Sequence, residues 1–268
     1  MGEPDIIGMG QRRFGRVNWL GLRTLIARET ARFANIWSQT ILAPVATAAL
    51  FLGVFSLALS ARAPGQEEEI LRFLAPGILM MTVIQNAFAN SSSSLLVAKV
   101  QGNIVDTLMP PLSALELTIG YALGGVVRGV AVALGILLTV FPFIGLGIAH
   151  PVWAATFLFM GSVCMALLGT LGAIVAQKFD HLSAVTNFVI TPLSFLSGTF
   201  YSISILPEIL QRASAANPFF YMIDGIRFGV LGASDADPAR GLAVLVVING
   251  ALAWLTWRWF RTGYKLKA

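Results

Sequence analysis

The chain has 268 residues, of which 56% are hydrophobic and only 12% are charged. A soluble domain carries about 25% charged residues, so a soluble globular protein is excluded. The net charge of +5 could point to nucleic acid, but the basic residues lie beside apolar runs, which indicates membrane orientation instead. One cysteine and two distant histidines support neither a disulfide framework nor a metal cluster.

The amino-terminal region divides into a polar tail and an amphipathic segment. Residues 1–17 are polar and are expected to form a flexible cytoplasmic tail. In residues 18–33, Trp19, Leu22 and Ile26 recur at helical spacing while the arginines point elsewhere. This pattern predicts a helix that lies in the membrane interface. The alternative is an ordinary lead-in to the first membrane span.

Six apolar runs are long enough to cross a bilayer, which takes about 20 residues each. They cover residues 36–59, 73–97, 112–141, 152–176, 183–200 and 241–260. We therefore expect an all-α integral membrane protein with one membrane domain over residues 1–268. A kink is expected at Pro44, and the loop from Ser60 to Arg72 is expected outside.

Several polar residues interrupt the apolar runs. Asn86 and Asn90 in the second run, and Asn187 and Thr191 in the fifth, either join helices or line a translocation pathway. Arg128, near the middle of the third run, would cost about 2.5 to 3.5 kcal/mol to insert, so it should face protein or water. A structural pairing with backbone carbonyls and a role in the pathway are both open for Arg128.

The third run also carries a set of closely spaced glycines, which predicts a small-residue face for close helix packing. These glycines are Gly120, Gly124, Gly125 and Gly129.

A polar break with two prolines separates the second and third runs. We expect a short helix over about residues 100–109, with Gln101 to Leu108 at its centre, lying across the membrane surface. Pro110 and Pro111 should end it, because proline cannot continue a helix beyond its first turn. A soluble partner could push on this segment. The inside loop from Gln177 to Leu182 is a second, weaker candidate for that contact.

Residues 201–232 contain apolar pieces that are too short to span a bilayer. Such pieces often mark re-entrant or interfacial segments. We expect two short outside helices that dip back into the outer leaflet, split near Asn217-Pro218.

The distribution of Lys and Arg predicts the orientation. With both termini inside, the cytoplasmic segments carry more basic residues than the outside loops, as the positive-inside rule requires. The cytoplasmic set is Arg12, Arg13, Arg16, Arg23, Arg28, Arg32, Lys99, Lys178, Arg258, Arg261, Lys265 and Lys267, against Arg62, Arg72, Arg212, Arg227 and Arg240 outside.

The sequence contains no catalytic motif that we can identify. It has no GxxxxGK[ST] loop, so the chain is not expected to hydrolyse ATP by itself. GxSxG, HExxH and CxxC are also absent, and His150 and His181 fall at opposite membrane faces. We therefore expect no catalytic residues, metal ligands or bound cofactor in this chain.

Five stretches together resemble the ABC-2 type transporter permeases, most closely the YadH-like and NodJ-like bacterial branch. They are RETARFANIWSQTILAPV at 28–45, FLAPGILMMTVIQNAFAN at 73–90, AKVQGNIVDTLMPPLS at 98–113, KFDHLSAVTNFVITPLSFLSGTFYSISILPE at 178–208 and NPFFYMIDGIRFGVLG at 217–232. Each stretch alone is weak evidence for the resemblance, but their occurrence in this order along nearly the whole chain is specific to the family.

The resemblance implies a type V exporter fold that works as a homodimer with two copies of a separate ATPase, which binds ATP and Mg. It places the coupling helix on Gln101, Gly102, Asn103, Ile104 and Asp106, and a second ATPase contact on Arg28, Glu29 and Arg32. It also implies a multi-pass protein of the bacterial inner membrane. The chain has no large extracellular domain and no fused ATPase, which argues against the sterol-transporter branch.

The function expected from this resemblance is the permease subunit of an ATP-driven exporter. Its substrate would be a lipid, a glycolipid or polysaccharide, or a hydrophobic drug-like molecule. One alternative is a secondary transporter or channel that needs no ATPase. Another is a membrane-embedded enzyme acting on lipid, which would require a clustered acid, base or metal site.

Overall fold

Only helices are found in the part of the chain that the computed structural model describes, residues 17–60, 65 and 67–266. Six helical segments are long and apolar enough to cross a membrane: Ser38–Ala58, Glu67–Val100, Ala114–Phe143, Pro151–Val175, Phe179–Thr199 and Pro238–Thr262. This confirms the all-α class, and within the described residues the number of candidate spans agrees with the six expected. The expected tail, except for Val17, lies outside the described residues.

The chain enters the bundle through α1, Trp19–Ala34, followed by a π-helical turn, η1 (Ser38–Leu42), and α2, Ala43–Ser60. The wide turn directly precedes Pro44, where the sequence predicts a kink. Proline has no N–H to donate to the carbonyl four residues earlier, so a regular α-helical turn cannot close there. The interfacial placement of α1 stays a prediction.

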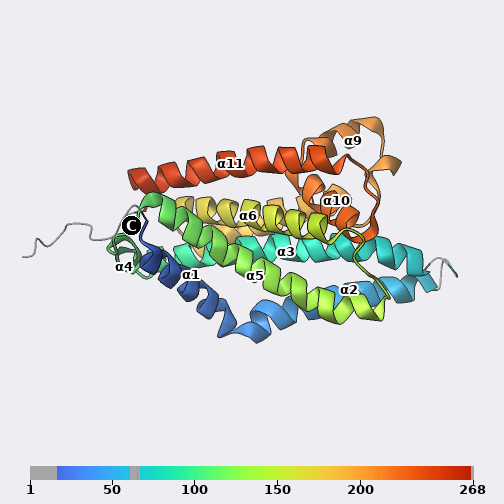
Figure 1. The fold of residues 1–268 in the computed structure, drawn as a ribbon, viewed down its shortest axis with the longest axis horizontal. Helices are drawn as coiled ribbons and strands as arrows, with labels where there is room; N and C mark the ends of the chain where they lie inside the picture. The colour runs from blue at the N-terminus through green and yellow to red at the C-terminus, as the bar shows by residue number, and fades with distance from the viewer. Residues whose placement is uncertain (1–16, 61–64, 66, 267–268) are drawn as a thin grey trace, which may run out of the picture.

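The centre of the bundle is α3, Glu67–Val100, which packs against α5 and α6 (Figure 1). Of the six segments it is the most buried, with 72% of its apolar window inside the protein. The helix begins six residues before the expected span, so the prediction of a loop up to Arg72 was wrong. The acidic run Glu67–Glu69 forms its first turn, where carboxylates interact favourably with the helix dipole.

The polar break folds into a helix shorter than expected. α4 covers only Ile104–Leu108, because Gly102 adopts a φ of +76° and ends the continuation of α3. Pro110 and Pro111 follow directly, as predicted. α5, Ala114–Phe143, then begins with a capping box in which Ser113 and Glu116 satisfy each other's backbone N–H groups.

The predicted glycine face of α5 serves two neighbours. A Cβ on Gly120 or Gly124 would lie 2.3 or 2.7 Å from Leu25 or Glu29 of α1. A Cβ on Gly125 or Gly129 would lie 2.5 or 2.8 Å from Ala166 or Ser162 of α6, Pro151–Val175. These glycines therefore permit close approach of α5 to both helices.

The fifth span is an irregular helix made of α7 (Phe179–Val185), η2 (Thr186–Ile190), α8 (Thr191–Ser194) and η3 (Phe195–Thr199). It begins four residues before the expected start, so most of the predicted inside loop from Gln177 to Leu182 is helical. Asp180 lies in the first turn of α7 and Leu182 is buried, which accounts for the early start. Gly198, with φ of +82°, ends the span.

The remaining elements are a 3-10 turn, η4 (Ile203–Ile205), and helices α9 (Glu208–Ala215), α10 (Pro218–Leu231) and α11 (Pro238–Thr262). The break between α9 and α10 lies at Asn217, whose side chain caps α10. α9 and α10 lie at the end of the bundle opposite α4, and α11 and α2 run along opposite sides (Figure 1). The depth of α9 and α10 in a bilayer stays a prediction.

Candidate coupling surface and buried polar cluster

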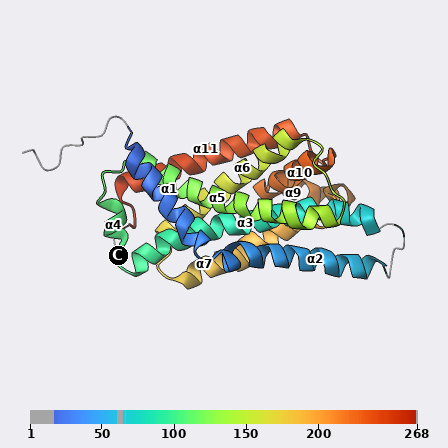
Figure 2. The ribbon, with the colours of Figure 1, turned by 60° about the horizontal axis from the view of Figure 1, so that its bottom comes forward.

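α1 and α4 meet at one end of the bundle, where α1 crosses α5 obliquely (Figure 2). Between them lies a notch of about 250 Å³, which we name the α1–α4 notch. Its lining residues come from α1, α4 and the proline turn: Asn18, Leu20, Gly21, Thr24, Leu25, Arg28, Asp106, Thr107, Pro110, Pro111 and Leu112. Two of the predicted coupling residues, Arg28 and Asp106, are therefore brought to one surface feature.

α4 has a fixed inner face and a free outer face. Ile104 and Thr107 are buried, and Arg28 Nη1 lies 3.4 Å from the hydroxyl of Thr107 as its donor. On the outer face Val105 and Met109 are exposed, Met109 by 76%. Gln101, Gly102 and Asn103 are exposed in the turn before α4 and do not line the notch. The outer face is therefore free to receive a partner while the inner face is held by the bundle.

Glu116 joins three segments at this end of the molecule. One carboxylate oxygen accepts the backbone N–H of Asn18 at 2.6 Å, and the other accepts the N–H of Ser113. The amide of Asn18 donates to the carbonyl of Pro111 at 3.4 Å. The start of α1, the proline turn and the start of α5 therefore form one connected unit.

Lys99 connects the end of α3 to α6. Its ammonium donates to the carbonyls of Ala173, Ile174 and Ala176 at 3.0, 2.7 and 2.9 Å. The last carbonyls of a helix have no partner within the helix, and a cation there also interacts favourably with the dipole. From the sequence, Lys99 was expected only to contribute to the positive charge of the cytoplasmic side. Its contact with α6 fixes the point from which the chain leaves α3 toward α4.

Glu29 points into the bundle and not toward the surface. It is 1% exposed, accepts a hydrogen bond from Ser94 at 2.7 Å, and lies 3.5 Å from Arg32 and 3.6 Å from Arg28. The absence of a side chain on Gly124 makes room for it. The expectation that Glu29 contacts an ATPase directly does not fit this burial. Its geometry suits a link between α1 and α3.

Arg32 extends the same link along α3. Its Nη2 donates to the backbone carbonyl and the side-chain oxygen of Asn90 at 2.7 and 3.0 Å, and its Nη1 donates to Ser93 at 3.2 Å. Asn90 is fully buried. Arg32 is therefore engaged with α3 in the same way as Glu29, which leaves Arg28 as the α1 charge that faces the notch.

Arg128 of α5 lies against Asn86 of α3, and its Nη2 donates to the side-chain oxygen of Asn86 at 2.8 Å. The partner is thus a side chain and not a backbone carbonyl. Arg128 Nε and Asn90 Nδ2 are buried and hydrogen-bond to no described residue. We name Glu29, Arg32, Asn86, Asn90 and Arg128 the buried polar cluster. Its members come from α1, α3 and α5 and carry net positive charge.

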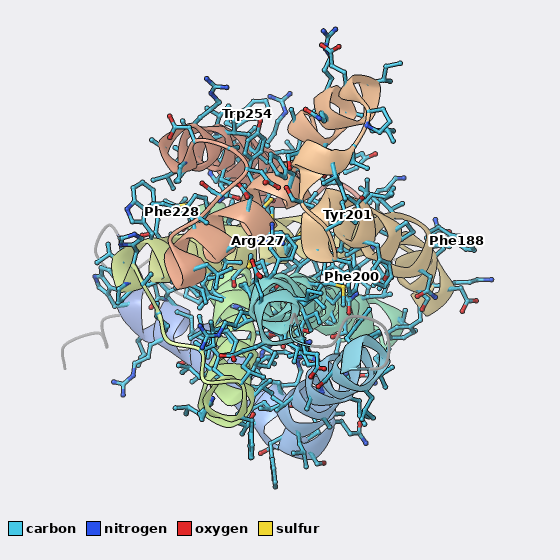
Figure 3. All side chains as sticks on the ribbon, turned by 90° about the vertical axis from the view of Figure 1, so that its right-hand side faces the viewer. Phe188, Phe200, Tyr201, Arg227, Phe228 and Trp254 are labelled. Atoms are coloured by element: carbon cyan, nitrogen blue, oxygen red, sulfur yellow. The ribbon has the colours of Figure 1, made fainter. Side chains whose placement is uncertain are left out.

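Asn187 and Thr191 are separate from this cluster. Asn187 is exposed on the fifth span beside Phe188, which is 81% exposed and lies at the rim of the bundle (Figure 3). The five residues predicted for the pathway therefore fall into two groups: Asn86, Asn90 and Arg128 lie between α1, α3 and α5, whereas exposed Asn187 and half-buried Thr191 lie on the fifth span.

A second charged network lies at the end that carries α9 and α10. Arg227 is buried near the middle of the bundle in the end-on view (Figure 3), donates to the carbonyl of Gly198, and stacks its guanidinium 4.0 Å from the ring centroid of Phe73. Asp224 lies 3.9 Å from Arg227 and accepts the backbone N–H groups of Asp235 and Ala236. Burial raises the pKa of Asp224 and lowers that of Arg227.

This network joins α10 to the end of the fifth span, to α3 and to the loop before α11. From the sequence, Arg227 was expected among the basic residues outside the membrane, and no role was predicted for Asp224. Two opposite charges three residues apart in the apolar helix α10 were the available signal, because buried charges in such surroundings require partners.

Comparison with known proteins identifies the family. The family model of the ABC-2 type transporters matches residues 21–231. The chain is 37% identical over 253 residues to the inner membrane transport permease YadH of Escherichia coli strain K12, which covers 93% of this chain and 98% of that protein. Nodulation protein J of Rhizobium leguminosarum bv. viciae is 32% identical over 99 residues, 37% of this chain and 36% of that protein. The chain is a membrane-spanning transport subunit of the ABC-2 type transporter family.

Proposed function

We propose that this chain is the permease subunit of an ATP-driven exporter and that a separate ATPase docks on the α1–α4 notch. The notch carries one charge of each sign, Arg28 and Asp106, beside the exposed apolar face of α4. A soluble partner could recognise this combination by charge and by shape. ATP and Mg would be held by the partner, since the chain has no phosphate-binding loop.

The observation that carries the proposal is the continuous set of contacts from the notch into the core. Arg28 contacts Thr107 of α4, Glu29 accepts from Ser94, and Arg32 donates to Asn90. A force applied to α4 therefore reaches α3 through hydrogen bonds and ion pairs on the neighbouring helix α1. Such a connected polar network is a physical route for coupling.

In the mechanism that we propose, ATP closes two ATPase subunits, which press on α4 and α1. Arg28 joins α1 to Thr107 of α4, and Glu116 ties the start of α1 to α5, so the three helices move together. The motion rocks α3 and α5, which contact each other along the bundle, and opens an outward-facing pathway. The chain itself contributes shape and contacts but no covalent step.

A homodimer is the economical way to build such a pathway. In a single chain the segments Ser38–Ala58, Phe179–Thr199 and Pro238–Thr262 have only 17%, 33% and 22% of their apolar windows buried. The exposed face of the fifth span carries Asn187 as well as Phe188, a mixture more typical of a protein contact or a pathway than of a lipid-facing surface. Two copies would each bring one ATPase.

The relatives and the distribution of charges support the proposed location. A full-length relative carries the name of an inner membrane permease, and the segments that the sequence predicts to be cytoplasmic hold 12 of the 18 Lys and Arg residues. We place this end in the bacterial cytoplasm, with both termini inside. The cargo is a lipid, a glycolipid or polysaccharide, or a hydrophobic drug-like molecule taken from the cytoplasm or inner leaflet.

The test is co-purification of the ATPase with tagged variants from the native membrane. Asp106→Arg places a second positive charge in the notch and should reduce recovery of the ATPase at least ten-fold. Alanine across Gln101 to Asp106 should act in the same direction without unfolding the spans. Asp180→Arg, an exposed change of the same kind on α7 at the same end, is the matched control and should leave recovery unchanged.

Each outcome separates two docking surfaces. Loss with Asp106→Arg alone supports the notch. Loss with Asp180→Arg alone would move the contact to α7. Full recovery and full transport with both variants would reject docking at this end of the bundle.

A further inference from the structure

An apolar groove of about 750 Å³ runs between α1 and α5, on a different face of α1 from the α1–α4 notch. We name it the α1–α5 groove. Its walls include Trp19, Leu22 and Ile26 of α1, and Leu115, Ile119 and Leu123 of α5. The two helices touch where Gly120 meets Leu25, which closes the groove on its inner side. Ala27 and Ala31 also line the groove, and their small side chains do not obstruct it along its length.

The two charged residues of the groove, Glu116 and Arg23, lie at one end of it, and they differ in whether nearby groups already compensate their charge. Glu116 is 3% exposed, and its two oxygens accept backbone N–H groups of Asn18 and Ser113, so its charge is compensated locally. Arg23 is exposed, and within the described part of the chain no acidic group pairs with it. Trp19 lies one turn before Arg23 on the same face of α1 and is 73% exposed. The expectation that the arginines point away from the face of Trp19, Leu22 and Ile26 was therefore wrong for Arg23.

We propose that the α1–α5 groove binds an anionic phospholipid, with the phosphate on the guanidinium of Arg23 and one acyl chain along Ile26, Ile119 and Leu123. Basic pockets between membrane helices at the cytoplasmic side are suited to anionic headgroups, and tryptophan prefers the headgroup level. The volume is within the range of small-molecule sites, and an apolar cleft with one cation at its mouth matches a single lipid. The assignment to the inner leaflet rests on the proposed orientation.

Two other occupants fit less well. A second copy of the chain related by a two-fold axis would bring the same basic rim from each protomer together, which is repulsive. The partner ATPase approaches α4, and no residue of α4 lines the groove.

The experiment uses the purified full-length chain in detergent and measures bound lipid by native mass spectrometry. Two probes with identical acyl chains are titrated: phosphatidylglycerol, which is anionic, and phosphatidylethanolamine, which carries no net charge. The variant Arg23→Ala should weaken phosphatidylglycerol binding about five-fold, the effect of one basic contact with an anionic lipid, and should not change phosphatidylethanolamine binding. No ATPase is present, so the result does not depend on the coupling proposal.

The matched control is Arg258→Ala. Arg258 also lies one turn after a tryptophan, Trp254, but it is on α11 and does not line the groove. It should leave the affinity for phosphatidylglycerol unchanged. An equal loss with Arg23→Ala and Arg258→Ala would show general attraction to basic residues and would overturn the proposal.

A second variant tests the acyl-chain half of the site. Ala27→Phe narrows the groove at an exposed position of α1 and leaves Arg23 in place. It should lower the bound fraction of phosphatidylglycerol at least three-fold with an unchanged midpoint of thermal unfolding. Undiminished binding by a folded Ala27→Phe protein would overturn the placement of the chain in the groove.

Discussion

At the scale of single residues, the buried carboxylate of Glu29 is the centre of the link between α1 and α3. It is surrounded by a hydroxyl and two guanidinium groups, Ser94, Arg28 and Arg32. Glu29 itself is 1% exposed, so loss of its partners would leave a carboxylate uncompensated in a region of low dielectric. The arrangement therefore makes α1 a part of the bundle and not a loosely attached surface helix.

Glu29→Ala should lower the free energy of unfolding by about 1–3 kcal/mol, because the buried hydroxyl of Ser94 loses its acceptor, while Arg28 and Arg32 keep access to solvent. Denaturant unfolding in detergent measures the change. Glu208→Ala is the comparison, because Glu208 pairs with Arg212 at 2.6 Å where both side chains are more than three-quarters exposed. Exposed pairs contribute about 0–1 kcal/mol. Equal losses in the two variants would contradict the structural role assigned to Glu29.

At the scale of elements, the contact between α1 and α5 depends on the absence of a side chain at Gly124. A Cβ there would lie 2.7 Å from the Cβ of Glu29, so one of the two helices must shift. Gly250 of α11 has open space around it. The two glycines therefore test close packing separately from helix propensity.

Gly124→Ala should destabilise the protein by about 1–3 kcal/mol through overpacking and should reduce ATPase recovery, because α1 is displaced. Gly250→Ala should be neutral or should stabilise the protein by up to about 1 kcal/mol, since alanine favours helix. Thermal unfolding of both variants, followed by circular dichroism, gives the comparison. A Gly124→Ala protein as stable as Gly250→Ala would show that α1 does not pack as closely as described.

Sequence patterns predicted the spans because hydropathy is a local property of each run. They failed at two helix starts, Glu67 and Phe179, because the acidic residues that stabilise a first turn resemble a solvated loop. The contacts that build the candidate site join distant residues. Ser94 lies 65 positions from Glu29, and Ala173 lies 74 positions from Lys99. No local pattern in one sequence records such pairings, so Arg128 could be singled out but its partner Asn86 could not be named.

The predicted coupling helix shows what local sequence can determine and what it cannot. Its two prolines marked the end of α4 correctly, because their backbone chemistry is intrinsic. Its start was placed too early because Gly102 in a left-handed conformation is one of several turns that the residues allow. Arg28 and Asp106 were proposed from resemblance, and the fold explains why they share one notch.

At the scale of the whole molecule, the two ends of the bundle differ in character. One end holds α4 and the α1–α4 notch, and the other holds α9, α10 and the network around Arg227 (Figures 1 and 3). The proposed orientation puts the first end in the cytoplasm. Cys164 is the one cysteine of the sequence, and it is buried. Its replacement in a Cys164→Ala background leaves no native thiol that could react with the label.

In that background, single cysteines at Met109 and Ile209 should react from opposite sides of the membrane. The two native side chains are 76% and 81% exposed, so access is comparable. A membrane-impermeant maleimide added from the periplasmic side should label Ile209→Cys and should not label Met109→Cys until the membrane is permeabilised. Labelling of Met109→Cys in intact membranes would reverse the orientation.

The claim on which the account depends is that α4 and α1 transmit work from an ATPase into the bundle. The most direct measurement reconstitutes the chain in liposomes with and without its co-purifying ATPase. It follows fluorescent phospholipid, glycolipid and lipophilic dye across the bilayer. We predict movement of the transported probe only with the ATPase and ATP together, and its loss in Asp106→Arg. Equally fast movement by the chain alone, without nucleotide, would contradict the account.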